Sequence, residues 1–159
     1  MTLEQLGNAG DFIGGIAVII SLAYVALQLR RNSISLRAST FQAVSDSFAT
    51  FAAGLSSDPD GARIYMNGLQ GLDLSDEEKQ QFAFQILTVM RLQESAYFQW
   101  RSGILSDEQW EGMSNSATRI LRSPGAREMW PFWRLNFSQV FQEFVEKTQA
   151  RESRKSVPS

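Results

Sequence analysis

The sequence feature that most constrains this chain is an apolar segment without charged residues, FIGGIAVIISLAYVALQL, which runs from Phe12 to Leu29. As an α-helix, about 18 residues extend roughly 27 Å, which is enough to cross the hydrocarbon core of a bilayer. The ten Leu, Ile, Val and Phe side chains of the segment favour insertion by about 3 to 6 kcal/mol. The sequence therefore predicts a single transmembrane helix over residues 12–29.

The charges that flank this segment predict its orientation. Residues 1–11 contain no Lys or Arg, whereas Arg30, Arg31 and Arg37 follow the segment closely. The positive-inside rule then predicts a short external N-terminus at residues 1–11 and a cytoplasmic domain at residues 30–150. A cleavable signal peptide is the alternative, but it would need a positive charge before the segment and small residues where Arg30 and Arg31 stand.

The composition excludes several kinds of chemistry. The net charge is −2 with a pI of about 5.2, so the chain has no basic surface for nucleic acid. The sequence contains no Cys and no His, which excludes disulfides, the usual zinc sites and an imidazole base. It also lacks a glycine-rich phosphate loop and an EF-hand spacing. We expect no cofactor, no metal site, no catalytic residue and no nucleic-acid partner.

The helical pattern continues beyond the apolar segment. Between Gly15 and Phe51 there is no Gly or Pro, and apolar residues recur at intervals of three, four and seven at Ile34, Phe41, Val44, Phe48, Phe51 and Leu55. This spacing places them on one face of a helix. We predict one long helix that leaves the membrane and ends near Gly54.

Capping signals predict the later helices. Asp58 and Ser123 each precede a Pro, and Ser75 and Ser106 each begin a capping box that ends at Glu78 and Gln109. They predict helices near residues 59–69, 76–102, 107–122, 124–134 and 138–150. The expected fold is all-α, a transmembrane helix that continues into a small antiparallel helical bundle, with a flexible tail at residues 151–159.

Small residues in the predicted span form a seam of the kind that allows helices to pack closely in lipid. The seam consists of Gly10, Gly14, Ala17 and Ser21. It predicts a homo-oligomer, and the alternative is that the seam faces lipid.

Helix 76–102 is the longest after the first, and we expect it to be the centre of the bundle because one broad face carries Phe82, Ile86, Val89, Met90, Tyr97 and Trp100. The same helix carries a possible polar site. Its candidate ligand-binding residues are Arg91, Glu94, Tyr97 and Trp100. Glu94 lies at the edge of the buried face and needs a cationic partner, either Arg91 or one of Arg119, Arg122 and Arg127. The group is either a small polar pocket or an ion pair that fixes the register of the helices.

Aromatic residues concentrate in the second half of the chain, most densely in residues 129–133, Met-Trp-Pro-Phe-Trp. Such residues usually fill a core. They could also dock onto a membrane surface or grip a partner helix, because Trp favours places that are apolar on one side and wet on the other.

Several short stretches carry a likeness to other proteins. They include residues 6–8, 11–14, 16–18, 24–28, 31–32 and 37–40, the Glu94…Tyr97-Phe98-Gln99 run with Gly103, Trp110, and residues 123–125. In these the chain resembles an uncharacterised bacterial family, mostly proteobacterial, of small proteins with one N-terminal transmembrane helix and a helical cytoplasmic domain. The resemblance implies a bacterial cytoplasmic (inner) membrane protein and adds no catalytic residue.

Together these features predict a membrane-anchored protein that is not an enzyme. We expect an oligomeric scaffold or accessory subunit that acts through protein contacts, with the lipid bilayer and another membrane protein or a second copy as partners. The alternative is a membrane-tethered sensor or transport-related protein that binds a small apolar or amphipathic ligand in the helical bundle.

Overall fold

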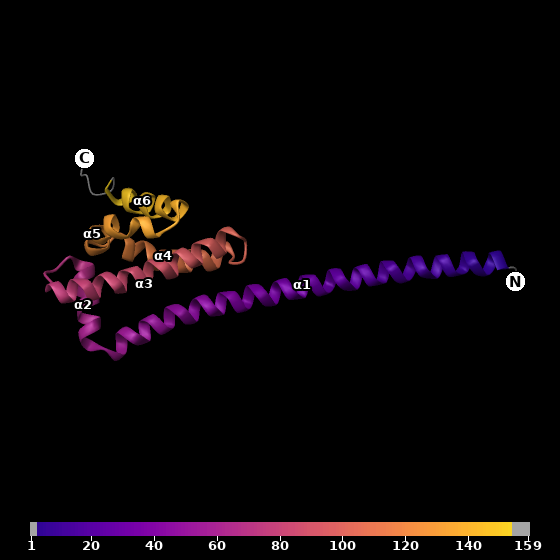
Figure 1. The fold of residues 1–159 in the computed structure, drawn as a ribbon, viewed down its shortest axis with the longest axis horizontal. Helices are drawn as coiled ribbons and strands as arrows, with labels where there is room; N and C mark the ends of the chain where they lie inside the picture. Colours follow the sequence, from indigo (N-terminus) through magenta and orange to yellow (C-terminus); the bar gives the residue numbers. More distant parts are fainter. Residues whose placement is uncertain (1–2, 154–159) are drawn as a thin grey trace. The chain divides into compact units, whose positions relative to one another are not determined.

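The computed structural model describes the backbone of residues 3–153 and the side chains of residues 14–150. The fold is all-α, as predicted, and residues 3–153 contain no β-strand (Figure 1). The elements are α1 (Leu3–Ser57), α2 (Pro59–Gln70), α3 (Asp76–Arg101), α4 (Asp107–Leu121), α5 (Pro124–Trp133), the 3₁₀ helix η1 (Arg134–Asn136) and α6 (Gln139–Ser153). The predicted flexible tail falls on residues whose side chains lie outside this description, although α6 continues to Ser153.

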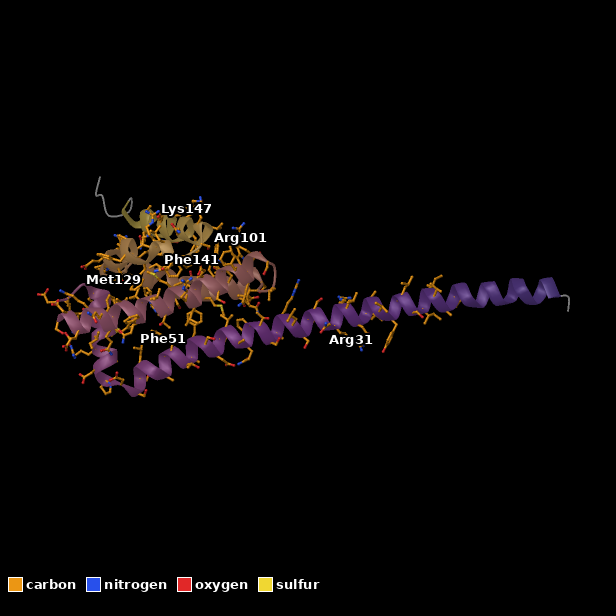
Figure 2. All side chains as sticks on the ribbon, in the orientation of Figure 1. Arg31, Phe51, Arg101, Met129, Phe141 and Lys147 are labelled. Atoms are coloured by element: carbon orange, nitrogen blue, oxygen red, sulfur yellow. The ribbon has the colours of Figure 1, made fainter. Side chains whose placement is uncertain are left out.

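The chain divides into two compact units, residues 1–39 and residues 40–159, and α1 contributes to both. In the first unit every residue from Gly14 to Ser39 is exposed to solvent. Figure 2 shows Arg31 in a stretch of α1 from which side chains project in different directions. The apolar side chains of residues 14–29 therefore have no protein core to fill within this unit.

In the second unit, one face of α1 packs against the bundle. Val44 is buried, and Phe41, Phe48, Phe51 and Leu55 pack against the same core. Ile34, which the spacing places on the same face of the helix, is 60% exposed, and the packed part of this face begins at Phe41. The helical period repeats whether or not a partner surface lies beside it. The helix also continues to Ser57 rather than ending near Gly54.

The predicted caps account for most helix starts. Ser75 accepts a hydrogen bond from the Glu78 N–H at 3.3 Å while the Glu78 carboxylate accepts one from the Ser75 N–H at 2.8 Å. Ser106 and Gln109 form the same reciprocal pair. Asp58 occupies the N-cap position of α2, but its side chain makes no capping hydrogen bond.

The helices α2 and α5 cross through two glycines. A Cβ on Gly125 would overlap the carbonyl oxygen of Gly68, and a Cβ on Gly68 would overlap the ring of Phe82. The two helix backbones are therefore in direct contact, with Phe82 of α3 beside the crossing. Figure 1 shows α2 leading from the end of α1 to the beginning of α3, with α4 and α5 packed beside α3 and α6 packed against α4.

The helix α3 is the centre of this bundle. Its buried residues include Phe82, Ile86, Val89, Met90 and Tyr97, which are five of the six apolar positions predicted on one broad face. The sixth, Trp100, is partly buried against the same core. Phe141 and Val145 of α6 and Leu121 of α4 are fully buried in the same core. The region that was predicted to organise the bundle therefore does so.

Candidate functional site

The predicted polar site on α3 begins with an ion pair. Arg91 Nη1 lies 2.8 Å from Glu94 Oε2. Of the four arginines considered as partners of Glu94, the one that pairs with it is therefore the nearest in the sequence. Arg91 Nη2 also donates a hydrogen bond to the carbonyl oxygen of Asn136 at 2.7 Å, and its guanidinium lies 4.6 Å from the ring centroid of Phe137. Arg91 thus holds the segment between η1 and α6 against α3.

The second carboxylate oxygen of Glu94 bonds to the same segment. Glu94 Oε1 accepts a hydrogen bond from the Ser138 N–H at 2.8 Å, immediately before α6 begins. Ser138 Oγ in turn accepts a hydrogen bond from the Phe141 N–H at 3.4 Å. A carboxylate at a helix N-terminus is favoured by the unpaired N–H groups and by the helix dipole. This geometry agrees with the structural interpretation, in which the ion pair fixes the register of the helices.

The other two predicted residues, Tyr97 and Trp100, belong to an aromatic cluster. The ring of Trp100 stacks on that of Trp110 with 5.2 Å between centroids, and Trp100 Nε1 donates to Asp107 Oδ1 at 2.8 Å. Tyr97 is buried and contacts Trp100, Trp110, Phe141 and Phe144 through its ring. These four rings come from α3, α4 and α6.

The four predicted ligand-binding residues therefore form two groups, an ion pair at the start of α6 and an aromatic cluster between α3, α4 and α6. Each group uses its polar and aromatic surface for contacts within the protein. A ligand beside Glu94, Tyr97 and Trp100 stays a prediction.

The predicted seam lies on the exposed part of α1. Gly14, Ala17 and Ser21 are all exposed, and a Cβ on Gly14 would meet nothing within 4 Å. The Ser21 hydroxyl donates to the Ala17 carbonyl at 2.8 Å, so its hydrogen bond is satisfied within the helix. Gly10 lies in α1, but its surroundings fall outside the described side chains.

The aromatic run at residues 129–133 divides between core and surface. Trp130 is buried and stacks on Phe137 with 5.7 Å between the ring centroids. Phe132 is 74% exposed, and Leu135, just beyond the run, is 84% exposed. Phe84 of α3 is also exposed, and its ring lies 6.4 Å from that of Trp133. We name Phe84, Phe132, Trp133 and Leu135 the α5–η1 patch.

A cleft that the sequence did not predict lies between α1, α3 and α4. It has a volume of about 730 Å³, and Phe41, Phe48, Gln93 and Met113 are among the residues that line it. Gln93 is only 2% exposed, and its amide oxygen has no hydrogen-bond partner among the described residues. The sequence does contain a signal for it, because Gln93 is a polar residue three and four positions from Met90, Val89, Ala96 and Tyr97 on the buried face of α3.

The pKa shifts in the second unit have structural causes. The pKa of Glu78 is lowered by the hydrogen bond from the Ser75 N–H and by Arg63, whose guanidinium lies 2.7 Å away. The pKa of Arg63 is raised by the same contact with Glu78. Burial raises the pKa of Tyr65 to about 12. These shifts belong to helix capping and core packing rather than to a reactive group.

Two further observations concern the class of protein. Within the described part of the chain, no group of three acidic side chains is arranged to hold a metal ion. One helix, near the N-terminus, is long and apolar enough to cross a membrane, and none of its apolar window is buried. This is compatible with a membrane location.

No family model, no curated protein and no solved structure matches the chain.

Proposed function

We propose that residues 12–29 anchor this protein in the bacterial cytoplasmic membrane, with the N-terminus outside and residues 30–150 in the cytoplasm. The exposed apolar surface of residues 14–29 supports an anchor, since lipid would cover side chains that no core covers. The arginines that follow the segment support the orientation. The resemblance to bacterial single-span proteins supports the choice of membrane.

The anchored domain acts as a non-enzymatic scaffold or accessory subunit through protein contacts. The observation that carries this function is the α5–η1 patch, in which the exposed Phe84 contacts the ring of Trp133 and the sequence neighbours of Trp133, Phe132 and Leu135, are more than two-thirds exposed. Exposed apolar side chains that gather on one surface are typical of protein interaction sites. A partner protein that covers this patch would remove its apolar surface from water.

Substitution within the patch tests this function. We expect Phe132→Ser combined with Leu135→Ser to remove a co-purifying protein from the full-length chain after gentle extraction from its own membrane, as measured by native mass spectrometry. Met66→Ser, which changes an exposed apolar residue of α2 outside the patch, is the matched control and should retain the partner. The proposal would be refuted if the double variant still co-purified with the partner, or if neither the unmodified protein nor the variant co-purified with any protein.

The scaffold is a homo-oligomer if the seam of Gly10, Gly14, Ala17 and Ser21 pairs with its copy. Gly14→Leu combined with Ala17→Leu would keep the helix backbones apart. We expect this variant to abolish cross-links between copies of the protein in membranes. Leucine at Val18 and Val25, which are exposed but outside the seam, is the control. Equal cross-linking in both variants would contradict pairing through the seam.

A further inference from the structure

A second pocket, at the end of α4, is lined by polar side chains. It has a volume of about 470 Å³, which falls within the range of sites that bind a small molecule. The described residues that line it are Asn115, Thr118, Arg119, Arg122 and Ser123. No acidic residue is among them, so these side chains carry two positive charges and no negative one.

Arg122 is held in place at this pocket by α6. Its Nε donates a hydrogen bond to the carbonyl oxygen of Thr148 at 3.2 Å, and the residue is partly buried. Its other two guanidinium nitrogens make no bond to the part of the chain that the structure describes, so they remain available as donors. A guanidinium that is already oriented loses less conformational freedom when it binds an anion.

Arg119 adds a second positive charge without a carboxylate to balance it. It stands three positions before Arg122, a spacing at which like charges on a helix repel each other. No acidic residue stands three or four positions from either arginine, and neither forms an ion pair with a described residue. Other arginines of the second unit do have carboxylate partners, as Arg63, Arg91 and Arg134 show. A bound anion would therefore relieve the repulsion between the two guanidinium groups.

Uncharged donors accompany the two arginines. The structure describes no hydrogen bond of the Thr118 hydroxyl. The Ser123 oxygen accepts a hydrogen bond from the Ala126 N–H at 3.3 Å, which leaves its own O–H free to donate. Several donors around two guanidinium groups suit an anion with several acceptor oxygens, such as phosphate.

The carbonyl groups at the end of α4 would otherwise disfavour an anion there. The Leu121 carbonyl accepts a hydrogen bond from Gln149 Nε2 at 3.0 Å, and the Ile120 carbonyl accepts one from the Ser123 N–H at 3.0 Å. These bonds satisfy carbonyl groups whose partial negative charge would act on the pocket. The two arginines therefore dominate the charge of the pocket.

We propose that this pocket binds the phosphate group of a phosphate monoester, carried either by a polar small molecule or by a lipid headgroup. Such a group has a charge of about −1.5 to −2 at pH 7, which the two guanidinium groups match. Arg119 and Arg122 pair with the phosphate oxygens, and Thr118 and Ser123 donate further hydrogen bonds. The site uses neither the α5–η1 patch nor the seam, so its failure would leave the scaffold function unaffected.

Two measurements on the full-length protein distinguish the two sources of the phosphate. The first is calorimetric titration of the protein in phosphatidylcholine nanodiscs with glycerol 3-phosphate, with glycerol as the comparison ligand. The second is native mass spectrometry of the protein from nanodiscs that contain equal amounts of phosphatidic acid and phosphatidylglycerol. Phosphatidic acid carries the same phosphate monoester on a lipid, whereas phosphatidylglycerol is an anionic diester. Binding of glycerol 3-phosphate alone indicates a soluble ligand, and preferential retention of phosphatidic acid alone indicates a lipid.

Three variants assign the binding to the pocket. We expect Arg119→Gln and Arg122→Gln each to weaken the binding about tenfold, because each removes charge-assisted hydrogen bonds. Arg101→Gln removes the same charge from an exposed residue that does not line the pocket, and it should change the affinity by less than about twofold. Tryptophan fluorescence verifies that each variant is folded. If Arg122→Gln unfolds because the bond to Thr148 is lost, the exposed Arg119 still decides the question.

Two outcomes would overturn the proposal. The first is that the unmodified protein binds glycerol 3-phosphate no more tightly than glycerol and retains phosphatidic acid no better than phosphatidylglycerol. The second is that Arg119→Gln and Arg101→Gln weaken the binding equally, because the phosphate would then respond only to the overall charge of the protein.

Discussion

The two parts of α1 use apolar side chains in opposite ways. From Gly14 to Leu29 such residues occur on every face of the helix and are exposed, whereas from Phe41 to Leu55 they form one stripe that packs against a core. The backbone is helical throughout both parts, because an α-helix satisfies its own hydrogen bonds in water and in lipid alike. The distribution of apolar residues around the helix, rather than the helix itself, therefore distinguishes the two environments.

Charged residues introduced into the first part of α1 should have the largest effect of the changes considered, because they oppose its insertion into a membrane. We expect Ile19→Arg combined with Leu22→Arg to make the free energy of membrane insertion less favourable by about 5 to 7 kcal/mol. Each Arg costs about 2.5 to 3.5 kcal/mol at the centre of a span. Both side chains are more than 60% exposed within the protein, so the change should leave the bundle intact. The measurement is the fraction of protein that alkaline carbonate leaves in the membrane.

The matched control places the same charges just beyond the apolar segment, as Ile34→Arg combined with Leu36→Arg. These residues are also exposed, at 60% and 58%, and should tolerate Arg at the membrane surface. Equal loss of the two variants from the membrane fraction would mean that residues 12–29 do not form the anchor.

The second part depends instead on close packing, and a single methyl group should disrupt it. Gly125→Ala would drive a Cβ into the carbonyl oxygen of Gly68, and we expect it to lower the free energy of unfolding by about 3 kcal/mol or more. Urea unfolding followed by Trp fluorescence measures the bundle alone. Gly112→Ala is the control and should be neutral or stabilise by up to about 1 kcal/mol, because its Cβ meets open space and Ala favours the helix. Destabilisation of similar size in both variants would argue against the contact of α2 with α5.

High pH should weaken the contact between the later part of α1 and the bundle through Tyr65. The ring of Tyr65 lies 5.7 Å from that of Phe51, and burial raises its pKa from the ordinary value of 10 to about 12. Because the folded state holds the proton more tightly, this stabilisation is complete below pH 10 and is lost as the pH rises through 12. The loss amounts to at most about 3 kcal/mol.

Tyr65→Phe isolates that effect from other groups that titrate at high pH. The variant should lack the part of the alkaline destabilisation that Tyr65 causes, so its unfolding free energy relative to the unmodified protein should increase between pH 10 and 12. Parallel pH profiles of the two proteins would show that the hydroxyl is not buried in solution.

Local signals in the sequence predicted most of the fold. Both capping boxes and both Ser-Pro and Asp-Pro starts lie where expected, and the helix bounds agree within a few residues, because these signals act over one turn of the chain. The apolar face of α3 was also predicted, since its period reports burial directly. The spacing did not show that Ile34 is exposed, because periodicity does not reveal where a partner surface begins.

Contacts between distant residues could not be predicted in the same way. The close approach of Gly68 to Gly125 depends on how α2 crosses α5, and the bond from Glu94 to the Ser138 N–H depends on where α6 begins beside α3. The cleft beside Gln93 combines residues of three helices. The sequence shows which residue types are present but not which distant residues contact one another. For this reason it left several arginines as possible partners of Glu94.

The smallest expected effect concerns the exposed contact of Glu78 with Arg63 and Ser75, which should contribute less to stability than the packed interior does. The hydrogen bond from Ser75 and the charge of Arg63 lower the pKa of Glu78, so its contribution to folding is present above the ordinary value of 4.5 and is lost as the pH falls through the lowered value. Glu78→Gln should therefore reduce the urea midpoint slightly at neutral pH and not at all in strong acid, with a smaller difference in high salt because Arg63 is half exposed. Glu77→Gln removes a carboxylate from the same turn, where the helix dipole acts but neither the Ser75 bond nor the Arg63 pair is made, and it should change the midpoint less. If the two variants behave alike at every pH, the helix dipole alone explains the carboxylates at the start of α3, and the bond between α2 and α3 through Arg63 contributes nothing measurable.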